Sequence, residues 1–151
     1  MTDIPLTGFV RPKVICVFRN GNRILVAEAI DPTTGQQFYC PPGGGIEFGE
    51  TSEVALRREI MEELETQIQD PCLLGVLENI FIYNGRQGHE IIFVYDGQLA
   101  DRSLYDLDRF VGIESGGDPF DLIWLDINNL APQMPPVYPD GLLNLLKKEQ
   151  L

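Results

Sequence analysis

Residues 43–66 read GGGIEFGETSEVALRREIMEELET, and this stretch decides the fold because it joins a glycine-rich turn to an acidic helix. Three glutamates, Glu59, Glu62 and Glu63, stand close enough in sequence for a helix to place them on one side. Like charges at helical spacing destabilise a helix by roughly 0.2–0.5 kcal/mol per pair. The stretch therefore predicts either a partner that neutralises these carboxylates or an acidic face that water solvates.

The helix is predicted to run from Thr51 to about Thr66, because no proline interrupts this segment. Thr51 or Ser52 caps its N-terminus, since a side-chain oxygen there accepts from an exposed backbone N–H. At about 100° per residue, the apolar side chains form one stripe that faces the core. That stripe comprises Leu56, Ile60 and Leu64, with Val54 and Met61 at its edge. The three glutamates lie on the other side of the helix, beside Arg58.

A solvated acidic face is the simpler interpretation, because glutamate is a good helix former and charged outer faces are common. Three features favour a cation instead. The acids cluster rather than alternate with lysine, and a further acid, Glu50, stands just before the helix. Gly43, Gly44 and Gly45 precede it, and glycines let backbone carbonyls approach a ligand closely. Hard divalent cations prefer carboxylate, carbonyl and water oxygens, so the sequence predicts a Mg²⁺ or Mn²⁺ site.

Length and charge restrict the function classes that are open to this chain. Its 151 residues suit one domain over residues 1–151. The formal net charge of −12 disfavours a long nucleic acid as partner, because phosphate contacts need clustered Lys and Arg. No apolar run is long enough for a membrane span, and the N-terminus does not resemble a secretion signal. A cytoplasmic location is therefore expected, and the sequence leaves the oligomeric state open, a homodimer included.

The nucleophile inventory is small. Cys16, Cys40 and Cys72 are scattered, without a CxxC pair, so buried free thiols are expected rather than a zinc site or a disulfide. The single histidine, His89, excludes any site that needs two histidines. It also leaves only one candidate for a Ser-His or Cys-His nucleophile pair.

Strand signals surround the acidic helix. Residues 11–20 and 22–30 are rich in β-branched residues and flank Asn20-Gly21, which predicts a hairpin. Residues 31–37 are predicted to form a loop, and residues 38–45 a short strand that runs into a Pro-Gly turn. Residues 72–84 and 89–99 are apolar runs joined by GRQG, which indicates an antiparallel pair after a strand region opened by Pro71.

The C-terminal part has weaker signals. Residues 100–120 are expected to be polar and irregular, and residues 121–127 to form a short strand around Trp124. Residues 131–139 are a proline-rich crossing, and residues 140–150 are predicted to form an amphipathic helix with Asp140 near its N-cap. Strands interleaved with two helices indicate a mixed α/β (α+β) class with helices packed on a sheet.

The helix and its preceding turn also resemble the Nudix box. In that pattern a Gly, a Glu, an Arg-Glu pair, an aliphatic residue and a Glu-Glu pair stand at fixed spacing. The chain fills these positions with Gly44, Glu50, Arg58, Glu59, Ile60, Glu62 and Glu63. It departs from the pattern at the end, where Glu65 replaces a glycine and Thr66 replaces an aliphatic residue. The departures affect how the helix ends, because glycine usually supplies the left-handed C-terminal residue.

The resemblance implies a Nudix fold, a mixed β-sheet sandwiched between helices. It implies metal-dependent hydrolysis of a pyrophosphate bond in a small nucleoside diphosphate linked to another moiety. Carried over by position, Glu59, Glu62 and Glu63 hold one to three divalent ions, Mg²⁺ or Mn²⁺, with a carbonyl of Gly43 or Gly44. The other two box residues support this site, in that Arg58 orients the glutamates and Glu50 stabilises the loop and helix geometry.

The general base and the substrate contacts are less sharply indicated. In similar proteins the base is a box glutamate or an acid on a loop before the late Trp strand, and Glu114 occupies such a loop. Glu90, next to the only histidine, is the second candidate. Phosphate contacts are assigned to Arg11, Gly43 and Gly44, with Arg19 and Arg86 as further arginines and Phe48, Tyr83 and Tyr105 as candidate stacking residues.

Two alternatives to an active hydrolase remain. One is a Nudix-like module that binds a nucleotide as a sensor without turnover. The other is an acidic α/β domain whose glutamate helix is merely solvated. The sequence selects no particular substrate among nucleoside triphosphates, dinucleoside polyphosphates and nucleotide sugars.

Overall fold

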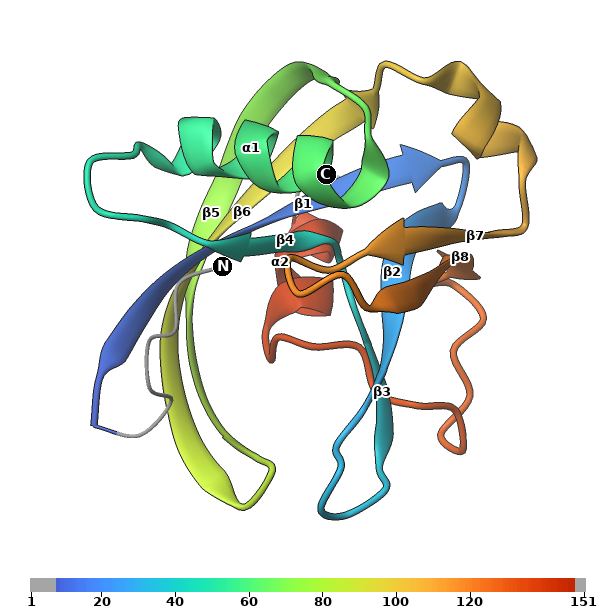
Figure 1. Ribbon diagram of the computed structural model, residues 1–151. Coiled ribbons are helices and arrows are strands. Elements are labelled where there is room, and N and C mark those ends of the chain that lie inside the picture. The colour runs from blue at the N-terminus through green and yellow to red at the C-terminus, as the bar shows by residue number, and fades with distance from the viewer. Residues whose placement is uncertain (1–7, 149–151) are drawn as a thin grey trace.

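The computed structural model describes residues 8–148 and consists of one mixed sheet with a helix on each side (Figure 1). The strand order is β5-β6-β1-β2-β8-β7, with β3 paired to β2 and β4 paired to β1. The strands are β1 (Val10–Asn20), β2 (Arg23–Ile30), β3 (Gln37–Cys40), β4 (Gly43–Gly45), β5 (Ile68–Tyr83), β6 (Arg86–Leu99), β7 (Arg109–Ile113) and β8 (Pro119–Asp126). Strands β1 and β6 run parallel, and the other pairs are antiparallel.

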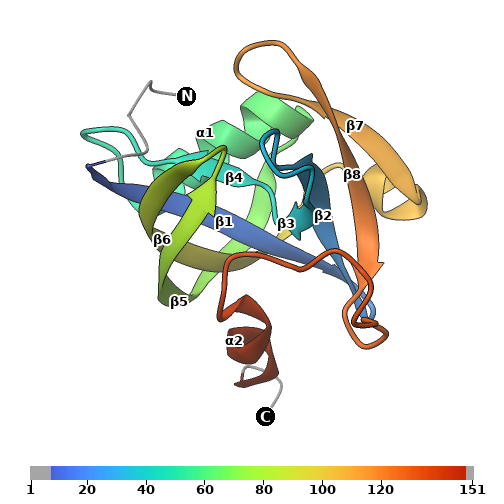
Figure 2. The same ribbon diagram turned by 90° about the horizontal axis from the view of Figure 1, so that it is seen from below.

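The two α-helices, α1 (Ser52–Leu64) and α2 (Leu142–Lys148), cover opposite faces of the sheet (Figures 1 and 2). Strand β1 supplies both cores, because successive side chains of a strand point to opposite faces. Val14, Cys16 and Phe18 pack on the α1 side, whereas Ile15 and Val17 pack on the α2 side. The predicted class, a mixed sheet between helices, is confirmed.

Strand β1 also divides the sheet into two leaves. The predicted turn at Asn20-Gly21 is present, but only the pairs Arg19↔Ile24 and Asn20↔Arg23 join β1 to β2. The rest of β1 pairs with β6 on one side and β4 on the other. Strands β1, β4, β5 and β6 therefore form one leaf and β2, β3, β7 and β8 the other, and residues of both leaves line a cleft.

The predicted antiparallel pair is strands β5 and β6, but its turn is Asn84-Gly85 rather than GRQG. Tyr83 faces Arg86 in the register, and both turn residues have positive φ, 52° and 72°. An Asn-Gly pair with both residues in that region is the favoured two-residue hairpin turn. Strand β5 also begins before Pro71, and it accommodates the proline by register shifts between Gln69 and Cys72.

Two predicted irregular segments are strands. Gly43–Gly45, expected to be a turn, forms β4, because these glycines pass very close to β1: a Cβ on Gly43 would lie 2.0 Å from the carbonyl oxygen of Val14. Within residues 100–120, a 3₁₀ helix (Arg102–Asp106) and strand β7 are present. Strand β7 escapes prediction because it lies at the sheet edge and Arg109, Val111 and Ile113 are exposed.

The C-terminal predictions hold in outline. The Trp124 strand is β8, and Trp124 is buried against the α1 side of the sheet. Helix α2 ends at Lys148 within the described residues, so the last part of the predicted helix 140–150 lies outside them. Over residues 8–148, no helix combines the length and hydropathy needed to cross a membrane.

Candidate functional site

Helix α1 is positioned by its cap and its apolar stripe. Thr51 is the N-cap, and its side chain accepts a hydrogen bond from the backbone N–H of Val54 at 3.2 Å. The predicted stripe is correct in its centre, since Leu56, Ile60 and Leu64 are buried. It is wrong at its edge, because Val54 and Met61 are 53% and 44% exposed. Ala55 is buried instead, and of the three glutamates Glu59 turns toward β4 whereas Glu62 stays exposed.

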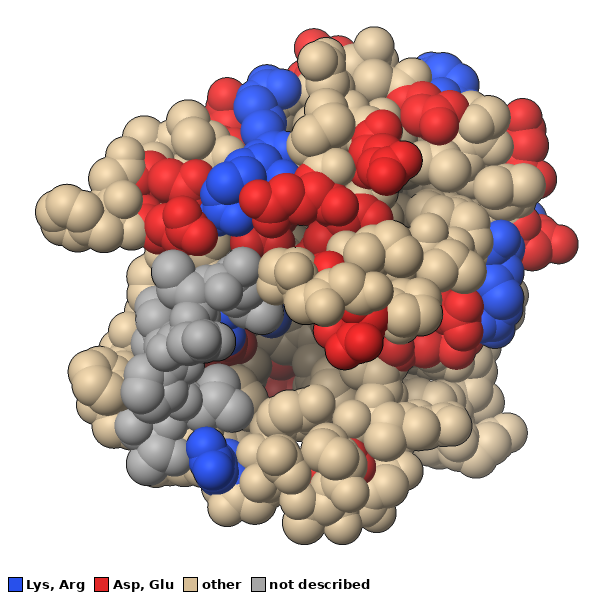
Figure 3. Space-filling model, viewed as in Figure 1, with Lys and Arg blue, Asp and Glu red and all other residues tan. Residues whose placement is uncertain are grey.

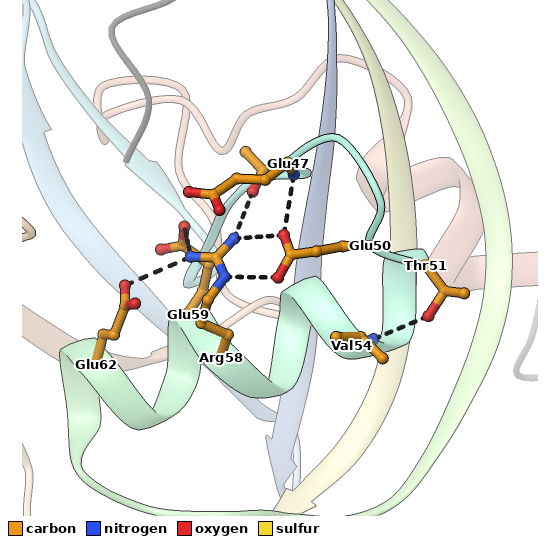
Figure 4. A network of polar contacts seen from close by, with 8 residues as sticks. Glu47, Glu50, Thr51, Val54, Arg58, Glu59 and Glu62 are labelled. Atoms are coloured by element: carbon orange, nitrogen blue, oxygen red, sulfur yellow. Dashed lines mark hydrogen bonds and ion pairs between the residues drawn. The ribbon is translucent and has the colours of Figure 1, made fainter.

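Arg58 organises the box residues (Figure 4). Its guanidinium binds both carboxylate oxygens of Glu50, at 2.7 and 2.8 Å, and donates to one oxygen of Glu59 at 3.0 Å. A fourth contact, 3.1 Å long, reaches the carbonyl oxygen of Gly45, and Glu62 lies at 3.5 Å. Arg58 therefore ties the helix to the preceding loop and to β4 through charge-assisted hydrogen bonds, which are stronger than neutral ones.

The ion pair between Arg58 and Glu50 shifts the pKa values of both groups in the direction that keeps them charged. Hydrogen bonds from Arg58 hold the pKa of the Glu50 carboxyl down to about 2, and the backbone N–H of Glu47 adds to this effect at 2.9 Å. In return, Glu50 and then Glu59 raise the pKa of Arg58 above its usual range. Both groups stay charged at any physiological pH, so the pairing acts as a fixed brace for the loop.

Glu59 sits between the helix and the glycine strand and is 2% exposed. A Cβ on Gly44 would lie 2.3 Å from the carboxyl carbon of Glu59, so only glycine leaves room for this carboxylate. The idea of a solvated acidic face is therefore wrong for Glu59. Burial of a carboxylate is costly unless it is paired and hydrogen-bonded, and here Arg58 supplies the pairing.

Glu63 borders a cleft of about 210 Å³ at the end of the helix. The lining residues are Lys13, Ala27, Glu28, Ala29, Cys40, Pro41, Pro42, Gly43, Glu63, Glu114, Ser115 and Phe120. They come from both leaves of the sheet, from α1 and from the β7–β8 turn. Figure 3 shows acidic side chains crowded on this side of the molecule above a hollow. Burial, followed by the nearby Glu59 carboxylate, raises the pKa of Glu63 to about 8.

The end of α1 accommodates both departures from the Nudix pattern. Glu65 adopts the left-handed conformation with φ of 56°, and its N–H donates to the carbonyl of Met61 at 3.1 Å. Thr66 is 5% exposed, and its hydroxyl accepts from the N–H of Asp101 at 2.9 Å while it donates to the Gln67 carbonyl. Glu65 thus ends the helix in the left-handed conformation that glycine usually supplies. The buried Thr66 hydroxyl has a hydrogen-bond donor and an acceptor as partners.

The donor set suits a hard divalent cation by its chemistry. Glu59, Glu62 and Glu63 bring three carboxylates to one side of the helix, and the Glu59 carboxylate occupies the room that Gly44 leaves by lacking a side chain. Among residues 8–148, however, no three acidic, histidine or cysteine side chains converge as a ready-made cage. Arg58 also holds Glu62, at 3.5 Å, so a cation bound by all three carboxylates requires the Glu62 side chain to turn toward Glu63.

The two candidate bases lie in different surroundings. Glu114 is exposed at the β7–β8 turn and lines the cleft with Glu63, whose pKa it helps to raise. Glu90 is 5% exposed on β6, where its Cα pairs with those of Arg11 on β1 and Asn79 on β5. The structure therefore places Glu114 beside the box glutamates at the cleft and Glu90 within the neighbouring leaf.

Of the remaining predicted substrate contacts, Arg11 lies next to the box, and the others are ion-paired, packed on another ring or exposed. Arg11 lies against the glycine strand, with one guanidinium nitrogen 3.0 Å from a Cβ position built on Gly45. Tyr83, the last residue of β5, packs edge-on against Phe38 on β3, with ring centroids 6.2 Å apart. The other candidates lie elsewhere: Arg19 pairs with Asp96, Tyr105 stacks on Trp124, and Phe48 and Arg86 are exposed.

The cysteine prediction is correct in part. Cys16 is buried, and Cys40 is half-buried in the wall of the cleft. Cys72 is exposed on β5, next to the register shifts in the pairing of β5 with β6. Sequence reasoning also missed Lys13, which lines the cleft. The signal was the alternation along residues 11–17, which places Lys13 on the same side as Arg11.

Comparison with known sequences decides the family. Residues 10–140 match the sequence model of the NUDIX domain. The chain belongs to the Nudix family. This match confirms the predicted family.

The similar proteins agree with this assignment. An RNA pyrophosphohydrolase of Gluconobacter oxydans (strain 621H) is 43% identical over 68 residues, which are 44% of this chain and 38% of that protein. The chain thus matches well under half the length of this relative.

Solved structures extend the likeness to the whole Nudix fold. The MutT NUDIX hydrolase from Burkholderia pseudomallei has a TM-score of 0.65 at 24% identity. The match covers 92% of this chain and 97% of that hydrolase. The NUDIX hydrolase from Nitrosomonas europaea has a TM-score of 0.66 at 18% identity, with coverages of 94% and 89%. At such identities the likeness shows the fold.

Proposed function

We propose that this Nudix protein hydrolyses a pyrophosphate bond in a small nucleoside diphosphate derivative, with Mg²⁺ or Mn²⁺ bound by Glu59, Glu62 and Glu63. The observation that carries the proposal is the position of Glu63. It stands at the end of the box helix and also lines a cleft, so the box carboxylates meet a space that a substrate can enter. Gly43, at the same cleft, adds a backbone carbonyl.

The protein's own residues prepare this site. Arg58 fixes the Glu59 carboxylate and is itself braced by Glu50, so the first carboxylate has a defined orientation. Glu63 completes the set from the next turn of the helix. A divalent cation bound there neutralises phosphate oxygens and lowers the pKa of a bound water. Phosphoryl transfer depends mainly on such positioning and charge stabilisation, which fits a chain without a paired Ser-His or Cys-His nucleophile.

For the proton transfer we propose Glu114 as the general base. Its carboxylate lines the cleft opposite the helix and is exposed, so it reaches a water between itself and Glu63. A positioned carboxylate that accepts the proton of the attacking water typically contributes 10²–10⁴-fold. Glu90 is the second candidate, and its burial at 5% exposure favours a role within its own leaf.

The substrate is proposed to be small. The cleft of about 210 Å³ is below the roughly 300–1,000 Å³ of pockets that enclose a whole drug-sized ligand, so it holds one part of a nucleotide derivative. The net charge of −12 disfavours contact with the body of a long nucleic acid. Because one relative is named an RNA pyrophosphohydrolase, a 5′-triphosphate oligonucleotide belongs among the substrates to be tested.

The test is a hydrolysis panel with Mg²⁺, Mn²⁺ and EDTA. It contains nucleoside triphosphates, dinucleoside polyphosphates, nucleotide sugars, ADP-ribose and the 5′-triphosphate oligonucleotide. Glu62→Gln and Glu63→Gln are expected to keep the fold and to lose at least about 100-fold in kcat, because each removes a carboxylate from the proposed metal site. Glu53→Gln, an exposed change on the same helix, is the matched control.

Two outcomes would change the proposal. If either variant retained full turnover, its assigned role would be wrong. If the wild-type protein bound nucleotides with Mg²⁺ but cleaved nothing in the panel, the sensor module would replace the hydrolase as the better description.

A further inference from the structure

Lys13 occupies a distinctive position on β1. Alternation along the strand places its side chain on the same side as Ile15, opposite to Val14. Here β1 no longer pairs with β2, because their pairing is confined to residues 19–24. The Cα of Lys13 pairs instead with those of Gly45 on β4 and Ile92 on β6. The half-buried side chain therefore projects between the two leaves and lines the cleft.

The surroundings of Lys13 are acidic. Of the twelve residues that line the cleft within residues 8–148, three are glutamates, and Lys13 is the one lysine or arginine. Lys13 acts electrostatically on Glu63 and on the Cys40 thiol, so its ammonium group lies in the part of the cleft that faces the end of the box helix. A negative ligand in this cleft meets one positive side chain of the protein.

Among residues 8–148, Lys13 takes part in no ion pair. The ion pairs between described residues involve Arg19, Arg23, Arg57, Arg58 and Arg109, and none of them involves Lys13. Glu28, another acid of the lining, is bound by Arg109 at 2.8 Å. Lys13 thus acts on Glu63 from beyond ion-pair distance, across the cleft that both residues line.

We propose that Lys13 binds the phosphate chain of the substrate on the side of the cleft opposite the box carboxylates, an inference that rests on the proposed hydrolase function. The phosphate chain of a nucleoside diphosphate derivative is anionic, and the three glutamates that line the cleft repel it. A lysine ammonium is a compact cation that binds phosphate as a point charge. Half-burial strengthens this attraction, because the local dielectric is lower than in bulk water.

The role predicts a particular kinetic signature. A contact that is equally strong in the ground state and in the transition state lowers KM without raising kcat. Loss of one hydrogen bond to a charged group costs about 1.5–3 kcal/mol, which is roughly 10- to 100-fold in binding. Lys13→Met is therefore expected to raise KM by about 10- to 100-fold, with kcat within about threefold of the wild type.

The experiment compares Lys13→Met and Lys13→Arg with Lys147→Met, a control that removes the same charge from an exposed position on α2 that does not line the cleft. KM and kcat are measured on the best substrate of the panel. Calorimetry measures the affinity for ADP in the presence of Mg²⁺, and separately the affinity for Mn²⁺ without nucleotide. Lys13→Arg keeps the charge and is expected to stay within about fivefold of the wild type in ADP affinity. If Lys13→Met does not fold, Lys13→Gln, which also removes the charge, takes its place in the same measurements and is expected to show the same loss.

The outcomes separate this inference from the hydrolase proposal. Weaker ADP binding in Lys13→Met with Mn²⁺ affinity unchanged supports the phosphate role, even if the wild-type protein turns over nothing in the panel. Unchanged KM and unchanged ADP affinity in an active Lys13→Met variant overturn it. A loss of Mn²⁺ affinity as large as the loss of ADP affinity also overturns it, because Lys13 then acts through Glu63 rather than on the substrate.

Discussion

Glu63→Gln should change how the stability of the metal-free protein depends on pH. Burial and the neighbouring Glu59 carboxylate raise the pKa of Glu63 from its ordinary 4.5 to about 8 in the folded protein. In the unfolded chain that pKa returns to its ordinary value. Between these two values the folded state holds a proton that the unfolded state has lost, so the free energy of unfolding falls as pH rises through this window.

The size of the effect follows from the shift. Each pKa unit corresponds to 1.36 kcal/mol, so the difference between 4.5 and about 8 sets an upper limit of about 5 kcal/mol. Glu63 borders the open cleft, and rotation of its side chain toward water relieves part of the repulsion once it ionises. We therefore expect the wild-type protein to lose about 2–3 kcal/mol relative to Glu63→Gln between pH 5 and pH 8.5.

The assay is urea unfolding in EDTA at pH 5, 7 and 8.5, followed by circular dichroism. The quantity compared is the difference in unfolding free energy between each variant and the wild type, so that titration of other groups cancels. Glu53→Gln, exposed on the same helix, should give a difference that does not change with pH. If the Glu63→Gln difference were equally independent of pH, the reasoning about burial and the Glu59 carboxylate would be refuted. Excess Mg²⁺ should restore the lost stability at high pH, since a bound cation stabilises the folded state.

Three further changes test the geometry around the box. Arg58→Lys should lose the two-oxygen contact with Glu50 and cost about 1–3 kcal/mol of stability by thermal unfolding, with kcat falling because Glu59 is no longer held. Gly44→Ala should displace the Glu59 carboxylate, whose carbon lies 2.3 Å from the new Cβ; a reduction in kcat of less than about tenfold would contradict this crowding. Glu65→Gly should stabilise the protein by about 0.5–1 kcal/mol, because it removes the cost of a left-handed non-glycine residue at φ of 56°, and a lower melting temperature would show that this cost is absent.

The elements that were predictable are those whose signals are local in sequence. The cap at Thr51, the stripe of Leu56, Ile60 and Leu64, and the hairpin turn at Asn20-Gly21 each depend on residues a few positions apart. The spacing of the box also lies within one segment, so it identified the family without knowledge of the fold. Nothing beyond short-range geometry was required for these predictions.

The errors arise where a partner comes from a distant part of the chain. Three glycines have low strand propensity, and β4 forms only because β1 lies alongside it at very short distance. The burial of Glu59 likewise depends on Gly44, which stands fifteen positions earlier in the sequence. Lys13 was missed for the same reason, since its importance appears only when β2, β3 and α1 close a cleft around it.

The crowding of acids on α1 has a different physical explanation at each position. Glu50 and Glu59 are neutralised by Arg58, which is why they can be buried or half-buried without a cation. Glu62 is exposed and water screens it. Glu63 is neither paired with Arg58 nor fully exposed: burial and then the Glu59 carboxylate raise its pKa, and Lys13 offsets this only in part. The repulsion noticed in the sequence is therefore concentrated on one residue, which stands where the helix meets the cleft, and a divalent cation at that point relieves it most.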